Sequence, residues 1–326
     1  MSNTIDPRLD RQDVFDPEKY VLRWDDQSHK AIMTELQDAR REERRIYAPE
    51  LLDDPVYLRS DMDIAWGRYN GTLQHFVPWL NRLMNYRPLG VVVEIGGGTG
   101  SSAAAFAHIC ERIISYDFDG HSLEFARRRC KALGIGNVEF RCENGVAALS
   151  QYTDGIDGVL LFAVLEHMTI SERLETLKAS WEALRTGGFI LIAETPNRLA
   201  YQDHHTTGLP FFNLLPVELA AEYVGRTGRT DVKYAVEHAR HVGPQAVQDA
   251  MIRSGYSGPS YHEFELAFGA NYADYLVSRA DDPEVFRVHG DFAAEVEALS
   301  AYARAKGLQV DPQFWQQYLS LVFRKP

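Results

Sequence analysis

Short apolar runs alternate with longer amphipathic segments from residue 90 onward, and this alternation constrains the fold more than any other feature of the chain. Five runs are predicted strands, at residues 91–95, 112–117, 138–142, 158–162 and 189–193. Between them, residues 123–133 and 170–184 repeat apolar side chains at the spacing of one helix face. Strands that alternate with helices form βα units. The chain is therefore predicted to be an α/β protein with a doubly wound, mostly parallel sheet that carries helices on both faces.

The part of the chain that precedes this α/β region is predicted to be helical. Residues 27–46 and 60–86 carry apolar side chains at helical spacing, and Pro88 stops the second pattern. We therefore divide the chain into an N-terminal helical segment, residues 1–88, and a Rossmann-like domain, residues 89–326. For the N-terminal helices two interpretations stay open: a lid over the site, and a surface through which the chain forms a homo-oligomer.

The regular alternation breaks after Glu194. Two insertions are predicted, at about residues 199–243 and 270–316, and the first is rich in His, Pro, Gly and aromatic residues. The remaining predicted elements are helices around 217–224 and at 244–254, a strand near 261–266, helical structure over 270–308 and a closing strand at 317–324.

The charge and cysteine content limit the compartment and the partners. A formal net charge of −12 argues against a nucleic-acid partner, because such proteins need a basic surface to neutralise phosphates. The polar, acidic N-terminus does not resemble a signal peptide, and no apolar run has the length of a membrane span. Cys110, Cys130 and Cys142 lack metal-ligand spacing and are predicted to be buried free thiols. We therefore expect a cytoplasmic protein.

The sequence VVVEIGGGTGSSAAAFA, residues 91–107, contains the first predicted strand and the turn that follows it. Glu94 lies near the end of the strand. Gly96, Gly98 and Gly100 then allow a tight turn and a close approach of a ligand to the backbone. In open α/β sheets, the crevice at the carboxyl end of the first strand is a place where nucleotides bind.

Further candidate ligand-binding residues follow the next two predicted strands. Asp117 ends the second strand, and its carboxylate can accept hydrogen bonds from both hydroxyl groups of a ribose. Phe118 can flank an adenine ring, and Asn144 offers an amide to the edge of that ring. The pattern therefore predicts a nucleoside site. Its structural alternative is that Asp119 caps the next helix and Asp117 only faces solvent.

These residues, together with LEH at 165–167 and TGGFILIAETPNR at 186–198, resemble class I S-adenosylmethionine-dependent methyltransferases. The resemblance is strong over residues 85–198 and is greatest to the group that methylates small molecules such as secondary metabolites, sugars, lipids or keto acids. It implies S-adenosylmethionine as the cofactor, a small-molecule acceptor, and a seven-stranded sheet whose last strand is antiparallel.

The same resemblance implies roles for individual residues. Glu94 and the glycine turn would hold the methionine part of the cofactor, and Asp117 would hold the ribose. Phe118 and Asn144 would meet the adenine, and Gly145 would also belong to the cofactor site. Many members of the family have Asp where this chain has Asn144, and an amide can also contact adenine.

Two other functions stay open. The first is an NAD(P)-binding oxidoreductase, because residues 98–103 fit the pattern G-x-G-x-x-A. Against it, Glu94 precedes the turn, where its charge would face the pyrophosphate of a dinucleotide. The second is a protein that binds S-adenosylmethionine without catalysing a reaction.

Histidines are the candidate general bases. Methyl transfer from a sulfonium depends mainly on positioning, and a base helps when the acceptor is a hydroxyl or a carbon acid. His167 follows the fourth predicted strand, and a local structural role is its alternative. His204, His205 and His241 lie in the insertion that is expected to cover the mouth of the site.

The histidines of that insertion are also candidate metal ligands. His204, His205, His238 and His241 could bind a divalent metal that polarises the acceptor. Residues 208–216, which are apolar and aromatic, could line the acceptor pocket or pack on the core. The metal dependence and the identity of the base stay open at this point.

Overall fold

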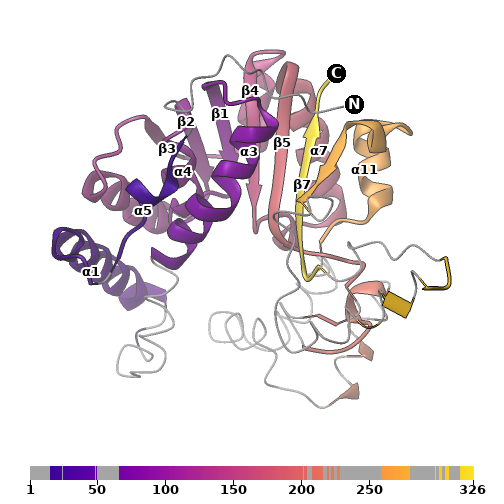
Figure 1. Ribbon diagram of the computed structural model, residues 1–326, viewed down its shortest axis with the longest axis horizontal. Helices are drawn as coiled ribbons and strands as arrows, with labels where there is room; N and C mark the ends of the chain where they lie inside the picture. Colours follow the sequence, from indigo (N-terminus) through magenta and orange to yellow (C-terminus); the bar gives the residue numbers. More distant parts are fainter. Residues whose placement is uncertain are drawn as a thin grey trace. The chain divides into compact units, whose positions relative to one another are not determined.

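The computed structural model describes residues 15–23, 25–47, 49, 66–200, 202–203, 208–215, 219, 222–223, 226–227, 258–279, 298, 301–302, 305–307 and 316–326. Seven strands form one sheet in the order β3-β2-β1-β4-β5-β7-β6 (Figure 1). Because β1 lies inside the sheet and later strands are added on both sides of it, the sheet is doubly wound. It is mostly parallel, and β7 runs antiparallel to both of its neighbours. The predicted fold class is thus confirmed.

The five strands predicted from the apolar runs are all present, and each observed strand contains the predicted one. The seven strands are β1 (Leu89–Ile95), β2 (Cys110–Asp117), β3 (Val138–Cys142), β4 (Ile156–Phe162), β5 (Leu184–Pro196), β6 (Leu276–Ser278) and β7 (Tyr318–Arg324). The predicted closing strand is therefore confirmed as β7.

The chain divides into two compact units, of which the first comprises Met1–Ala148 and Ile156–Gly158. In this unit β1 pairs with β2, and β2 with β3, all in parallel. Val92, Val93 and Ile113 are fully buried in the middle of these strands. Its helical elements are η2 (Pro17–Lys19), η3 (Gln27–His29), α1 (Lys30–Tyr47), the π-helical turn η5 (Thr72–Phe76), α3 (Val77–Leu83), α4 (Ser101–Phe106) and α5 (Gly120–Ala132).

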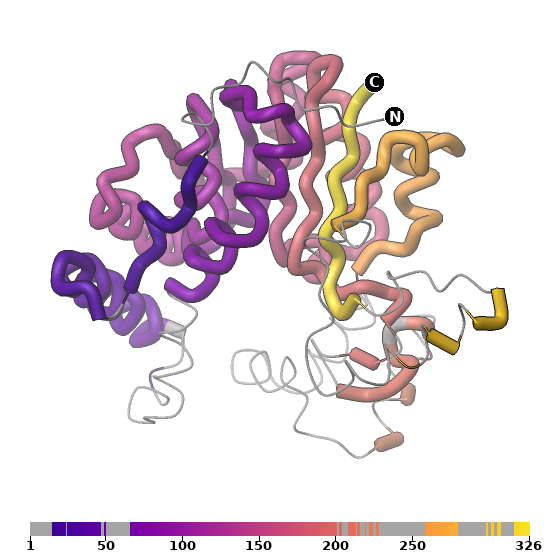
Figure 2. Tube along the Cα trace, in the orientation of Figure 1, coloured from indigo at the N-terminus to yellow at the C-terminus, as the bar shows by residue number. Residues whose placement is uncertain are grey.

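Helix α1 lies along α5, which follows β2 directly (Figure 2). Asp119 is the N-cap of helix α5. Its side chain accepts a hydrogen bond from the backbone N–H of His121 and so satisfies one free donor of the first turn. On the exposed side of the contact, Arg128 of α5 forms ion pairs with Glu35 and Glu42 of α1. The predicted N-terminal helix therefore packs on a helix of the α/β region.

The second unit comprises Leu149–Gly155 and Val159–Pro326. Strand β5 pairs with β7 in antiparallel orientation, with Ile190 opposite Phe323, and the short β6 pairs with the other edge of β7. Its other elements are η6 (Ser150–Tyr152), η7 (Leu165–His167), α7 (Ile170–Ala183), η8 (Phe212–Leu214), α11 (Tyr261–Phe268) and η9 (Tyr272–Tyr275).

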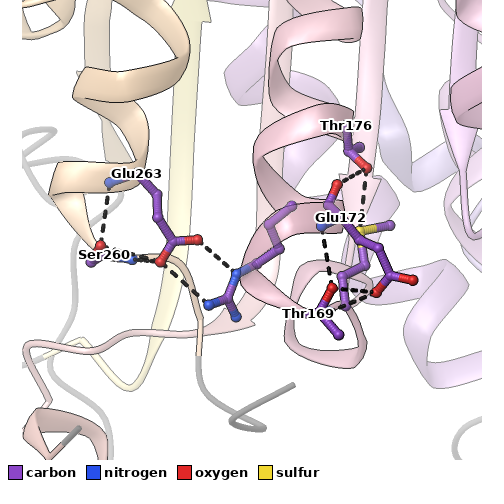
Figure 3. Close-up of polar contacts among 7 residues, drawn as sticks. Thr169, Glu172, Thr176, Ser260 and Glu263 are labelled. Carbon is purple, nitrogen blue, oxygen red and sulfur yellow. Dashed lines mark hydrogen bonds and ion pairs between the residues drawn. The ribbon is translucent and has the colours of Figure 1, made fainter. Parts of the chain in front are cut away.

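Capping boxes start the two longest described helices of this unit (Figure 3). Thr169 and Glu172 exchange side-chain-to-backbone hydrogen bonds at the start of α7, and Ser260 and Glu263 do so at the start of α11. The predicted strand near 261–266 was wrong, because α11 occupies these residues. Phe264 and Phe268 of α11 pack on Phe323 of β7, so the apolar pattern there reflects a helix face.

Two further predictions are corrected. Residues 276–278, within the stretch expected to be helical, form β6 instead, because their backbone pairs with β7. Cys110 and Cys130 are buried as predicted, but Cys142 is exposed. Cys142 ends β3, the edge strand of the sheet, whose residues are at most half-buried. Among the described residues, no helix has both the length and the apolar character needed to span a membrane.

Candidate cofactor and active site

The glycine turn connects β1 to α4 and lies against the end of β2. The backbone N–H groups of Gly96 and Gly97 both donate to the carbonyl of Tyr116, at 2.8 and 3.1 Å. Gly96, Gly98 and Gly100 have φ angles of 72°, 48° and 71°, a left-handed conformation that other residues rarely adopt. The turn thus needs glycine where the sequence analysis placed it.

Close packing also requires glycine at residues 97 and 100. A Cβ atom on Gly97 would lie 1.9 Å from Ser115 Oγ, and one on Gly100 would lie 2.7 Å from the Cβ of Ala126. At Gly98, by contrast, a Cβ atom would meet no atom of the described residues within 4 Å. The turn is therefore packed tightly against the sheet and α5, while its middle faces open space.

Glu94 lies beneath this turn and is fully buried. Ser102 Oγ donates to its Oε1, and Ser115 Oγ donates to its Oε2 at 2.6 Å. Burial raises the pKa of the Glu94 carboxyl, while these hydrogen bonds act in the opposite direction. Both carboxylate oxygens thus join β1 to β2 and α4, so Glu94 supports the turn from behind.

Asp117, at the end of β2, is bound to the turn itself. Its Oδ2 accepts a hydrogen bond from the backbone N–H of Gly98 at 2.7 Å, and its Oδ1 accepts one from the N–H of Asp119 at 2.8 Å. Asp119 caps α5, as the structural alternative proposed, but Asp117 does not merely face solvent. A carboxylate has about four acceptor positions, so these two bonds leave room for further donors, as the predicted contact with a ribose requires.

The two residues predicted to meet a purine have different surroundings. Phe118 is 77% exposed, which is unusual for a phenylalanine and makes the side chain accessible to a flat ligand. Asn144 Oδ1 accepts hydrogen bonds from the backbone N–H groups of Val146 and Ala147 and so caps α6 (Gly145–Leu149). A contact from Asn144 to adenine would therefore use its Nδ2 donor.

Gly145 is buried for a packing reason. A Cβ atom there would lie 2.6 Å from Ile95 and 2.7 Å from Tyr116. Gly145 therefore brings the start of α6 close to the ends of β1 and β2.

Two residues of this region were missed by the sequence analysis. Ser101 is nine-tenths buried directly after the glycine turn, and among the described residues its Oγ has no hydrogen-bond partner. Arg129 is fully buried beneath the turn, and its Nε donates to the carbonyl of Thr99 at 2.9 Å. Burial lowers the pKa of Arg129 to about 9. The run ARRRC reads as a solvated helix face, so the sequence offers no signal for this arginine.

His167 belongs to the second unit, in η7 after β4. The neighbouring Glu166 is fully buried, and its Oε2 accepts a hydrogen bond from Thr195 Oγ1 of β5 at 3.0 Å. His167 Nε2 lies 3.9 Å from Glu166 Oε1, and its side chain is 35% exposed. The histidine thus combines a buried carboxylate neighbour with access to solvent.

The remaining histidine candidates lie outside the described residues. These are His204, His205, His238 and His241, and the predicted helix at 244–254 lies outside them as well. In the apolar segment at residues 208–216, burial differs among the described residues. Leu209 and Phe212 are buried, whereas Phe211 is 59% exposed. Within the part of the chain that the structure describes, no group of three His, Cys, Asp or Glu side chains could hold a metal ion.

The region around the glycine turn is similar to known methyltransferases. Residues 92–188 match a family model described as a methyltransferase domain. A protein-L-isoaspartate O-methyltransferase from Picosynechococcus is 25% identical over 42% of this chain and 60% of its own length. A probable S-adenosylmethionine-dependent methyltransferase from Mycolicibacterium smegmatis is 31% identical over 37% of this chain and 44% of its own length.

Among solved structures, the YcgJ protein from Bacillus subtilis aligns with 76% of this chain and 97% of its own length, at 15% identity and a TM-score of 0.40. This chain covers only part of the length of the two curated relatives described above. The aligned regions make up less than half of this chain.

Proposed function

We propose that this chain, whose residues 92–188 form a class I S-adenosylmethionine-dependent methyltransferase domain, methylates a small-molecule acceptor. One observation carries the proposal: the carboxylate of Asp117 is bound to Gly98 N–H in the glycine turn, with the exposed ring of Phe118 as its chain neighbour. Asp117 would accept from the ribose and Phe118 would flank the adenine, next to each other at the carboxyl end of β2.

The residues of the first unit fit S-adenosylmethionine chemically. The open space above Gly98 lets a ligand approach the backbone, and the buried Ser101 Oγ is a polar group suited to the amino-acid end of the cofactor. Asp117 would accept from the ribose hydroxyls, and Asn144 Nδ2 would donate to an adenine ring nitrogen. Glu94 would act from behind the turn, because its oxygens already accept from Ser102 and Ser115.

The bound cofactor would supply a methyl group on a positively charged sulfur, whose departure needs no acid. The chain's task is then to position the acceptor and, for a hydroxyl or carbon acid, to remove its proton. His167 is the candidate base among the described residues, with Glu166 placed to stabilise the imidazolium that forms. His204, His205 and His241 remain candidates for the same role, with a His-bound metal as the alternative.

For the acceptor, a small molecule is supported by the net charge of −12, which does not suit a nucleic acid. A protein carboxyl group is the second candidate, because several curated relatives are protein-L-isoaspartate O-methyltransferases. Transfer of a radiolabelled methyl group should separate the two acceptors. An isoaspartyl peptide is expected to stay unlabelled, whereas a pool of small hydroxylated and carboxylated metabolites should yield labelled product.

Binding measurements separate the proposal from its alternatives. S-adenosylhomocysteine is expected to bind with micromolar affinity, and NAD(H) and NADP(H) are expected not to bind. Binding of a dinucleotide instead would support an oxidoreductase. Binding of S-adenosylhomocysteine without any methyl transfer across the acceptor panel would support a non-catalytic binding protein. Alanine at both His204 and His205 should slow the transfer step, and unchanged turnover would remove these two residues from the mechanism.

A further inference from the structure

Helix α1 carries an ion pair that is almost entirely buried. Arg40 Nη1 contacts Glu43 Oε2, and the two side chains are only 7% and 5% exposed. Removing two charges from water costs free energy, which is offset only when further hydrogen bonds satisfy the pair. Such a bond is present on α5, where Ser122 Oγ donates to the other carboxylate oxygen, Glu43 Oε1, at 2.9 Å.

Ser122 also contacts the cap of its own helix. Its Oγ also lies 2.6 Å from Asp119 Oδ2, so the single hydroxyl proton is shared between the carboxylates of Glu43 and Asp119. The other oxygen of Asp119 accepts from the N–H of His121, which fixes the orientation of the Asp119 side chain at the start of α5.

The backbone of Asp119 extends this series of contacts to the cofactor site. Its N–H donates to Asp117 Oδ1 at 2.8 Å, while Asp117 Oδ2 accepts from Gly98 N–H at 2.7 Å. These two bonds determine how the plane of the Asp117 carboxylate is oriented, and hence where its remaining acceptor positions point. The hydrogen-bonded series thus runs from Glu43 through Ser122, Asp119 and Asp117 to the glycine turn.

We infer that Glu43 and Ser122 are positioning residues for ribose recognition: helix α1 holds the start of α5 so that Asp117 presents its free acceptor positions to the ribose hydroxyls. This inference rests on the proposed function, because it needs a nucleoside at Asp117. It gives the N-terminal helix a part in cofactor binding, although none of its described residues belongs to the glycine turn.

The test compares two ligands that differ only in the ribose. Isothermal titration with S-adenosylhomocysteine and with its 2′-deoxy analogue gives a ratio of dissociation constants that reports on the hydroxyl contact. The wild-type protein should bind the hydroxylated ligand about tenfold more tightly, which corresponds to about 1.4 kcal/mol of binding free energy. In S122A and E43Q this ratio should fall to about two, because only the affinity for S-adenosylhomocysteine weakens.

Two variants provide matched controls. Glu42→Gln removes the same charge from the neighbouring residue of α1 and breaks an ion pair with Arg128 of α5, but Glu42 is outside the series. It should keep the wild-type ratio. Ser122→Thr keeps the hydroxyl and should restore the ratio that S122A loses.

The outcomes are distinct. A wild-type ratio in both S122A and E43Q would overturn the inference. An equal loss of affinity for both ligands would also overturn it, because that pattern indicates general loosening of α5. A wild-type protein that binds neither ligand would instead overturn the proposed function, and this inference with it.

Discussion

The backbone N–H of Gly98 donates a 2.7 Å hydrogen bond to the carboxylate of Asp117, which joins the turn after β1 to the end of β2. The two residues that the sequence assigned to different parts of one cofactor thus stabilise each other directly. A site that is held in place by its own contacts needs less ordering when a ligand binds, and this lowers the cost of binding.

The glycine turn should tolerate no side chain at residue 100. Gly100→Ala combines a left-handed backbone, φ 71°, with a Cβ atom 2.7 Å from Ala126. Gly134→Ala is the matched control, because Gly134 has φ 69° but no atom of the described part of the chain lies within 4 Å of its Cβ position. We expect G134A to cost about 1–2 kcal/mol of unfolding free energy and G100A clearly more. Equal losses in urea denaturation would show that the turn is not tightly packed on α5.

The buried Glu94 carboxyl predicts a pH-dependent difference in stability. Its pKa is raised by burial above the ordinary value of 4.5, so the folded state binds this proton more tightly than the unfolded state does. The resulting stabilisation is complete below about pH 4.5 and is lost as the pH rises through the raised pKa. The free energy of unfolding of the wild type minus that of E94Q should therefore be larger at pH 5 than at pH 8. A difference that grows with pH would contradict the assignment.

Removal of Arg173 of α7 should strongly destabilise the second unit, because its ion-pair partner Glu263 of α11 would stay buried without a counter-charge. Arg173 is fully buried, and its Nε donates to Glu263 Oε2 at 2.8 Å. Arg173→Met leaves a buried carboxylate without this partner and should cost about 3 kcal/mol of unfolding free energy. The double variant R173M/E263Q should recover much of the loss, because glutamine is neutral and can still accept from Ser260 N–H.

A surface ion pair provides the control for that prediction. Arg41 and Asp38, on α1, are about half exposed and 3.6 Å apart, so R41Q should change the unfolding free energy little. If R173M cost no more than R41Q in chemical denaturation, or if E263Q deepened the loss, the buried pair would not stabilise the contact between α7 and α11.

The sequence was informative wherever local backbone rules decide the structure. The apolar runs predicted β1 to β5, and the glycines at 96, 98 and 100 predicted a turn that indeed needs a left-handed backbone. The sequence also contains the capping box of α11, Ser260 followed three residues later by Glu263, but the sequence analysis did not use it. The short apolar pattern after it nevertheless suggested a strand, because a run of six residues fits both periods.

Structural features that depend on residues far apart in the sequence could not be predicted. Arg173 reads as one more charged position of an amphipathic helix, since its partner Glu263 lies 90 residues away in the chain. Arg129 reads as solvated, yet the fold buries it beneath the glycine turn. The exposure of Cys142 depends on the place of β3 at the sheet edge, which follows from strand order and not from local composition.

The most direct test of the account is isothermal titration of S-adenosylhomocysteine into the wild type and Asp117→Asn. The substitution removes the charge and an acceptor oxygen that binds Gly98 N–H, so the dissociation constant should rise at least about 30-fold from a micromolar wild-type value. Asp274→Asn, the same change at an exposed residue of η9, should bind like the wild type. Undiminished binding by D117N, or no binding by the wild type, would contradict the claim that this carboxylate holds the ribose of the cofactor.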